Sequence, residues 1–365
     1  MNKTLISVIF CLLTAHIYAQ QTDKVMNDNN ITTQWDKTFR KSNKVAHAKV
    51  TFRNRYGITL VADMYTPLTA STAQRLPAIA VSGPFGAVKE QSSGLYAQHM
   101  AERGFVALAF DPSFTGESGG EPRRMASPDI NTEDFLAAVD FLSVQDNVDP
   151  QCIGIIGICG FGGMAINAAA LDTRIKATIA VTMYDMSKVN VEGYFQSEDS
   201  QAQRKTKREA LSRQRTEDFR NGSYLRAGGV VDPMPEDAPQ FAKDYYDYYK
   251  TPRGYHKRSG NSNDGWNTIG CQSFLNMPLL TWAHEIETPV MLIHGEKAHS
   301  RYFSEYAFQK MTVQTLPQPL DANAHITHGN KQLIIIPGAS HVDLYDDMAG
   351  KIPYDTIQEF FTQSM

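Results

Sequence analysis

The chain has 365 residues and a formal net charge of −4, with 42% apolar and 20% charged residues. This length corresponds to one large domain or two modest ones, and the composition is ordinary for a globular protein with a sizeable core. A slightly acidic chain whose aromatic residues do not alternate with basic clusters has no bulk attraction for nucleic acid or anionic membranes. We therefore expect no nucleic-acid partner.

The N-terminus predicts a secretory signal peptide over residues 1–19. Lys3 precedes an apolar run from Leu5 to Ala15, and Ile-Tyr-Ala at 17–19 provides a cleavage site. The apolar run is short for a bilayer, and we expect no membrane span elsewhere. Residues 20–42 are polar, which indicates a flexible leader. The expected protein is exported, either periplasmic or secreted.

The expected mature chain keeps three cysteines, Cys152, Cys159 and Cys271. An odd count leaves at least one thiol unpaired. One interpretation is a Cys152–Cys271 disulfide with a buried, inert third thiol, although Cys152 opens an expected strand and Cys271 lies far downstream. In an oxidising compartment, a thiol that stays unpaired is typically either shielded from oxidation or used in a reaction.

Short apolar runs alternate with amphipathic segments along most of the chain. Residues 45–51 and 59–65 flank Asn54-Arg55-Tyr56-Gly57 and predict a hairpin. Further strands are expected at 76–82, 105–110, 153–158, 176–181, 289–294 and 332–336, with helices at 90–103, from Asn131 or Thr132 to 142, and 164–171. Continuously apolar strands that alternate with helices predict a mostly parallel α/β sheet with helices on both faces.

The alternation stops between residues 187 and 285. Residues 203–220 are strongly basic and predict a solvated helix, and the tyrosine cluster at 244–250 is also expected to be exposed. An insertion at this point lies over the carboxyl ends of the strands, so we expect a helical lid. The core is then expected in two parts, residues 43–186 and 286–365.

The central motif is IGIIGICGFGG at residues 153–163. An apolar strand that runs into Cys159, then glycines and a helix, has the layout of a nucleophile elbow. The helix N-terminus is expected to lower the pKa of the thiol, and the N–H of Gly160 to donate to an oxyanion. Phe161 stands where the pattern has glycine, so an inactive elbow centred on Phe161 is an open alternative. The end of the apolar strand at Ile158 favours Cys159.

A second motif places His341 in a loop of small residues after the last strand. Because the order in such folds is nucleophile, acid, histidine, His341 is predicted to be the general base. The acid that orients its ring should follow an intervening strand. Glu296 is the first candidate and Asp185 the alternative. Asp343 is close in sequence to His341 and is expected to shape that loop.

The second oxyanion donor is expected from the loop at residues 83–88. Pro84 has no N–H, so the candidates are the N–H groups of Phe85 and Gly86. The adjacent Lys89 and Glu90 suggest a local ion pair. The loop at residues 111–120, which begins with Asp111, is expected to have a structural role. The histidines are scattered without metal-ligand spacing, and no phosphate-binding glycine loop is present, so neither a metal nor a cofactor is expected.

Together these motifs resemble a bacterial branch of the α/β-hydrolases that is similar to dienelactone hydrolases and, more distantly, to fungal polyketide acyltransferases. The resemblance covers residue 45 to the C-terminus and implies the α/β-hydrolase fold with a Cys–His–acid site. This branch usually has serine where this chain has Phe161. This departure weighs against catalytic activity if that serine takes part in catalysis. The residues that carry the resemblance lie at 83–91, 110–123, 157–160, 183–186, 295–304 and 338–343.

The expected activity is hydrolysis of a small-molecule ester, thioester or lactone through a covalent acyl-enzyme on Cys159. Acyl transfer by the same nucleophile is an alternative, as is a catalytically silent binding protein, which Phe161 favours. Peptidase activity has no separate support in the sequence. The sequence indicates neither the substrate nor the oligomeric state.

Overall fold

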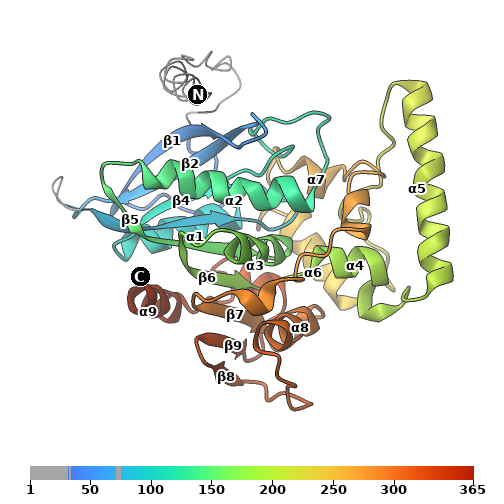
Figure 1. The fold of residues 1–365 in the computed structure, drawn as a ribbon. Coiled ribbons are helices and arrows are strands. Elements are labelled where there is room, and N and C mark those ends of the chain that lie inside the picture. The colour runs from blue at the N-terminus through green and yellow to red at the C-terminus, as the bar shows by residue number, and fades with distance from the viewer. Residues whose placement is uncertain (1–31, 33, 71–74) are drawn as a thin grey trace, which may run out of the picture. The chain divides into compact units, whose positions relative to one another are not determined.

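A mixed sheet of nine strands, in the order β1-β2-β4-β3-β5-β6-β7-β9-β8, organises the part of the chain that the structure describes (Figure 1). The computed structural model describes residues 32, 34–70 and 75–365. The expected signal peptide and the first part of the expected leader lie outside the described residues. The segment from Trp35 to Met365 is one unit.

The centre of the sheet is parallel and its edges are antiparallel. β1 and β2 form the predicted hairpin, β2 pairs antiparallel with β4, and β8 closes the other edge against β9. β4 and β7 are buried along their whole length, as expected for strands covered on both faces. The strands are β1 Val45–Arg53, β2 Thr59–Pro67, β3 Leu76–Ser82, β4 Val106–Phe110, β5 Val148–Ile158, β6 Ile175–Val181, β7 Val290–Gly295, β8 His325–His328 and β9 Lys331–Ile336.

Helices cover both faces of this sheet and create two hydrophobic cores. Phe135 of α2, Met164 of α3 and Phe308 of α8 belong to one core. Tyr96 of α1 and Phe361 of α9 belong to the other. The predicted helix-covered sheet is therefore confirmed. The covering helices are α1 Ser92–Glu102, α2 Pro128–Ser143, α3 Gly160–Leu171, α8 Arg301–Thr312 and α9 Tyr354–Ser364.

The segment between β6 and β7 is helical, as expected. It contains α4 Met186–Glu192, α5 Gln201–Asn221, α6 Gln240–Lys250 and α7 Gly260–Asn263. α5 begins after the capping side chain of Ser200, ends at the left-handed Gly222, and stands out from the sheet (Figure 1). Among the described residues, no helix combines the length and apolar character needed to cross a membrane.

The tyrosine cluster of α6 is not exposed. Tyr248 and Tyr249 are buried, and Tyr248 packs edge-on against Tyr345 with ring centroids 5.0 Å apart. The expectation of an exposed cluster was wrong because α6 is amphipathic: Lys243 and Asp247 are exposed, and Tyr248 and Tyr249 lie on the buried face.

The end of the expected leader, residues 35–42, lies against the fold. Trp35 packs edge-on against His47, the Asp36 carboxylate pairs with Arg258 at 2.7 Å, and the Thr38 N–H donates to the Glu90 carbonyl at 2.9 Å. The expectation that this part of the leader is flexible was therefore wrong. Its polar composition does not reveal these three contacts, because they depend on residues far along the chain.

Candidate active site

The turn between β5 and α3 holds Cys159 in a strained backbone conformation. Its φ of 57° and ψ of −128° lie in a region that non-glycine residues rarely adopt, and such strain is typical of a nucleophile elbow. Phe161 is a regular residue of α3, so the alternative elbow centred on it has no strained residue. The elbow residue is Cys159.

Close approach of the backbone explains both the glycines and the unusual Phe161. A Cβ on Gly157 would lie 2.2 Å from the Phe161 carbonyl oxygen, and one on Gly160 would lie 2.7 Å from the Cβ of Phe85. The Phe161 ring instead enters the core, with its centroid 6.3 Å from Phe85 and 6.2 Å from Phe135. A bulky residue therefore fits at this position without entering the site.

Two backbone amides converge on the Cys159 sulfur. The N–H groups of Phe85, from the loop after β3, and of Gly160, at the start of α3, both lower the pKa of the Cys159 thiol. Two such donors from separate elements are what an oxyanion hole requires. The Gly86 carbonyl instead accepts from the Ser259 hydroxyl at 2.8 Å, an anchor to the insertion.

His341 is buried beside Cys159, and a tyrosine links the two. The Tyr345 hydroxyl lies 2.8 Å from Nε2 of His341, and Tyr345 also lowers the pKa of the Cys159 thiol, as a hydroxyl beside the sulfur does. Among the described residues, no hydrogen bond joins the thiol to the imidazole directly. The geometry therefore places Tyr345 between the predicted nucleophile and the predicted base, a residue that the sequence analysis did not select.

The structure does not bring either predicted acid to the imidazole. Glu296 accepts a hydrogen bond from the Gly338 N–H at 2.7 Å, and Asp185 caps α4 by accepting from the Lys188 N–H at 3.0 Å. Both carboxylates are committed to backbone N–H groups elsewhere, so neither is a hydrogen-bond partner of the ring.

Two hydroxyl groups occupy the position expected for the acid. Nδ1 of His341 lies 2.6 Å from Oγ of Ser300 and 2.8 Å from Oγ1 of Thr182. Ser300 is the residue before α8, four positions after Glu296, and Thr182 directly follows β6. The predicted Glu296 lies in the same segment after β7, but Ser300 and not Glu296 contacts the ring.

The hydroxyls extend into a directed hydrogen-bond chain. Oγ of Ser300 lies 2.9 Å from Nε2 of His294, whose Nδ1 lies 2.6 Å from Oγ of Ser304. Two assignments satisfy every member, and each is the reverse of the other. In the one that the proposed base requires, Tyr345 donates to Nε2 of His341, Nδ1–H donates to Ser300, Ser300 donates to His294, and His294 donates to Ser304. This assignment leaves Nε2 as the acceptor that faces Tyr345 and the thiol.

Burial keeps both the imidazole and the thiol neutral at neutral pH. It lowers the pKa of His341 well below its usual value, with a further contribution from the nearby His299 and His294. Burial also raises the pKa of the Cys159 thiol, although Tyr345 and the backbone N–H groups of Phe85 and Gly160 oppose this change. The expected lowering of the thiol pKa was therefore wrong, because desolvation outweighs the helix N-terminus.

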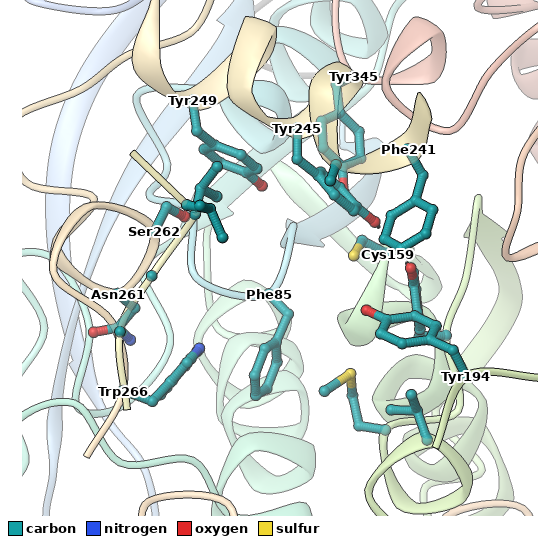
Figure 2. Close-up of a pocket in the computed structure, with 18 of the residues that line it drawn as sticks. Phe85, Cys159, Tyr194, Phe241, Tyr245, Tyr249, Asn261, Ser262, Trp266 and Tyr345 are labelled. Atoms are coloured by element: carbon teal, nitrogen blue, oxygen red, sulfur yellow. Dashed lines mark hydrogen bonds between the residues drawn. The ribbon is translucent and has the colours of Figure 1, made fainter. Parts of the chain in front are cut away.

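A cavity of about 450 Å³ opens beside Cys159. Figure 2 shows aromatic side chains around it, among them Phe85, Tyr194, Tyr245 and Trp266. Most of its lining comes from the insertion between β6 and β7. A volume of this size suits a small organic ligand.

A buried cluster of charges supports the loop that carries Phe85. Nζ of Lys89, which is fully buried, lies 2.8 Å from Glu90, 2.9 Å from Asp111 and 2.6 Å from Glu117. Arg258 of the insertion contacts Glu90 at 2.8 Å. The expected local ion pair thus belongs to a larger network. Removing one partner of such a network leaves uncompensated buried charge, so the cluster holds this loop in place.

Comparison with known proteins gives a family match over most of the chain. The model of the X-Pro dipeptidyl-peptidase (S15) family matches residues 56–347. The uncharacterized protein PA2218 of Pseudomonas aeruginosa is 54% identical over 336 residues, which are 92% of this chain and 85% of that protein. The uncharacterized protein YcjY of Escherichia coli is 34% identical over 310 residues, 82% of this chain and 93% of its own length.

Solved structures confirm the predicted α/β-hydrolase fold. The crystal structure of PA2218 superposes with a TM-score of 0.84 at 53% identity, covering 92% of this chain and 98% of that one. The α/β hydrolase GrgF of a Penicillium species superposes at 0.67 with 21% identity, covering 88% and 99%. Thiohydrolase aneE of Aspergillus aculeatus is 37% identical over 143 residues, 38% of this chain and 43% of its own length, which agrees with the fungal part of the resemblance. The dienelactone-hydrolase-like branch stays a prediction.

Proposed function

The chain belongs to the X-Pro dipeptidyl-peptidase (S15) family of α/β-hydrolase-type enzymes, and we propose that it is an acyl hydrolase with Cys159 as nucleophile and His341 as general base. One observation carries the proposal: Cys159 sits on a strained elbow, and the backbone N–H groups of Phe85 and Gly160 both act on its sulfur. A nucleophile with oxyanion donors at the same point suits attack on a carbonyl. The proposed substrates are esters, thioesters or lactones.

The contacts support a first step in which Tyr345 relays the proton. The thiol proton moves to the Tyr345 oxygen while the Tyr345 proton moves to Nε2 of His341, and the sulfur bonds to the substrate carbonyl carbon. The N–H groups of Phe85 and Gly160 stabilise the resulting oxyanion. Because thiol and imidazole are both neutral at rest, the proton transfer accompanies attack rather than preceding it. The imidazolium then returns its proton to the leaving group as the bond to that group breaks.

Water completes the proposed reaction. It attacks the thioester carbonyl, its proton passes to His341, and the thiol is regenerated as the acid leaves. The hydroxyls of Ser300 and Thr182 accept the Nδ1–H and orient the ring, but they stabilise an imidazolium less than a carboxylate does. A thiol is far more acidic than a serine hydroxyl, so a cysteine nucleophile needs a weaker base. This pairing supports Cys159 as the partner of a histidine without an acid.

Peptide hydrolysis is the second candidate, because the family model is named for X-Pro dipeptidyl peptidases. A dipeptidyl peptidase must accept the ammonium group at the substrate N-terminus. Among the described residues, no carboxylate lines the cavity beside Cys159. This lining supports ester-type substrates over peptides. Acyl transfer is a third outcome, distinguished by product analysis with and without an added alcohol or amine acceptor.

An acylation experiment tests the proposal. The protein is incubated with an activated acyl thioester and its intact mass is measured, with peptide mapping of the adduct. We expect one acyl group on Cys159, lost in Cys159→Ala and retained in Cys152→Ala, whose thiol lies outside the cavity. Absence of an adduct in the wild-type protein, or an equal adduct in Cys159→Ala, contradicts the proposal and favours a binding protein.

We also propose that the protein is exported. The support is Lys3 followed by the apolar run from Leu5 to Ala15, which is typical of a signal peptide. Expression of the full chain in a bacterium and N-terminal sequencing of the product should give a mature N-terminus close to residue 20 in the periplasm or medium. An uncleaved product that stays in the cytoplasm contradicts export.

A further inference from the structure

Aromatic rings from distant parts of the chain form the walls of the cavity beside Cys159. Phe85 and Trp266 stack at one side, with ring centroids 4.3 Å apart and planes inclined by 29°. Tyr194 and Tyr245 lie elsewhere around the cavity, nearer to Cys159 (Figure 2). The acyl group attached to Cys159 would therefore contact ring surfaces over much of its length.

The lining carries no formal charge at neutral pH. Among the described residues that line it, none is Asp, Glu, Lys or Arg. Burial raises the pKa values of Tyr184, Tyr245, Tyr249 and Tyr345 above the ordinary value for a phenol, so the hydroxyls stay protonated. An ionised substrate group would lose water in this cavity without gaining a charged partner.

The polar groups of the lining lie on two parts of the wall. The Tyr184 and Tyr245 hydroxyls lie 3.0 Å apart, and Tyr345 reaches the sulfur. At another part of the wall, the Ser262 hydroxyl donates to the Gly86 carbonyl at 2.7 Å, so that donor is occupied. The phenol hydroxyls near Cys159 suit a carbonyl oxygen and a water molecule, and apart from Asn261 and Ser262 the side chains of the remaining wall are apolar or aromatic.

We infer that this cavity selects an uncharged, ring-bearing or otherwise apolar acyl group and rejects acyl groups that carry an ammonium or a carboxylate. The inference rests on the proposed function and names its substrate class. The cation is the demanding case, because aromatic faces attract cations. Without a carboxylate in the lining, this attraction offsets only part of the lost hydration.

Two isosteric pairs of arylpropanoyl thioesters test the inference. One pair carries 4-tert-butyl or 4-trimethylammonio on the ring, and the other carries 4-nitro or 4-carboxylate. The members of a pair have nearly the same shape and differ in charge. Turnover by the wild-type protein is compared with the reaction of each probe with a small free thiol, which corrects for intrinsic reactivity. We expect kcat/KM to be at least tenfold higher for the neutral member of each pair.

Binding to the Cys159→Ala protein separates this inference from the proposed chemistry. The four probes are titrated calorimetrically, and the neutral member of each pair should bind at least tenfold more tightly. Absence of wild-type turnover with this binding preference intact contradicts the hydrolase and leaves the selectivity supported. Equal or tighter binding of a charged member overturns the selectivity even when turnover occurs.

A charge placed in the wall provides a matched control. Met234 is a half-buried lining residue in the loop before α6. Met234→Glu should raise the ratio of trimethylammonio to tert-butyl turnover at least threefold over the wild-type value, whereas Met234→Gln should leave it unchanged. An unchanged ratio in Met234→Glu, or an equal rise in Met234→Gln, contradicts control of selectivity by wall charge.

Discussion

Replacement of Tyr345 by phenylalanine tests the link between the thiol and the imidazole. The substitution removes one hydroxyl, which lies 2.8 Å from Nε2 of His341 and lowers the pKa of the Cys159 thiol, and it keeps the buried ring. General acid–base catalysis contributes about 10²–10⁴-fold to a rate. If Tyr345 carries the proton, kcat/KM should fall by about 10²-fold, which corresponds to about 2.7 kcal/mol in activation free energy.

The loss of stability should be smaller than the loss of activity. A buried hydrogen bond contributes about 1 kcal/mol, a small part of the roughly 5–15 kcal/mol that keeps a typical domain folded. Tyr345→Phe should therefore remain folded. The assay is the initial rate of thioester hydrolysis, with thermal unfolding measured on the same samples.

Tyr248→Phe is the matched control. Tyr248 is also fully buried and packs against the Tyr345 ring, but it does not line the cavity. It should lose similar stability and keep its activity. A Tyr345→Phe protein within threefold of wild-type kcat/KM, or an equal loss in both variants, would refute the proton relay and leave a structural role for Tyr345.

Three further predictions concern His341, His294 and the buried charges. Ser300→Asp should place a carboxylate beside His341 and raise the pKa of the imidazole, so the acidic limb of the pH–rate profile should move to higher pH. Ser300→Ala should lower kcat without moving that limb. Unchanged pH–rate profiles in both variants contradict the orienting role of Ser300. Burial lowers the pKa of His294 from 6.5 to about 3, so below pH 6.5 the unfolded chain binds one more proton at this residue than the folded chain does. His294 should therefore reduce stability by about 1.4 kcal/mol per pH unit as the pH falls from 6.5 towards 4. Urea unfolding at two pH values measures the slope, and His294→Gln should reduce it by about 1.4 kcal/mol per pH unit, with His299 and His341 still contributing; an unchanged slope contradicts the assignment. Lys89→Met should destabilise the fold by about 3–5 kcal/mol because the three carboxylate partners of Lys89 stay buried. Lys205→Met, on the exposed α5, should leave stability unchanged. Equal urea unfolding midpoints for the two variants contradict a supporting role for the charge cluster.

The sheet and the elbow could be predicted because their signals are local. Buried parallel strands must be apolar on both faces, and the run from Ile153 to Ile158 ends at the strained Cys159. The helix start before Phe135 was misplaced. Ser127 caps α2, and Pro128 occupies its first turn, so the helix begins before Asn131. Competing capping residues close together in sequence cannot be ranked by pattern alone.

The partners of His341 could not be predicted because they depend on three loops that meet only in the folded chain. Ser300 and Thr182 are common residues at strand and helix ends, and no spacing marks them as ligands of an imidazole. Tyr345 follows His341 by four residues, but its role depends on the position of Cys159. The expectation of a carboxylate came from the general order of such sites, and local backbone N–H groups hold Glu296 and Asp185 instead.

The ion pairs of the N-terminal segment have a practical consequence for recombinant expression. Asp36 and Lys37 reach from the N-terminal segment to Arg258 and Asp63, and Arg258 in turn belongs to the segment that roofs the cavity. A shortened gene product that starts at residue 43, a natural choice from composition alone, would lack both contacts. It would leave Asp63 without its lysine and release Arg258 from one of its two carboxylates, so truncation boundaries belong upstream of Trp35.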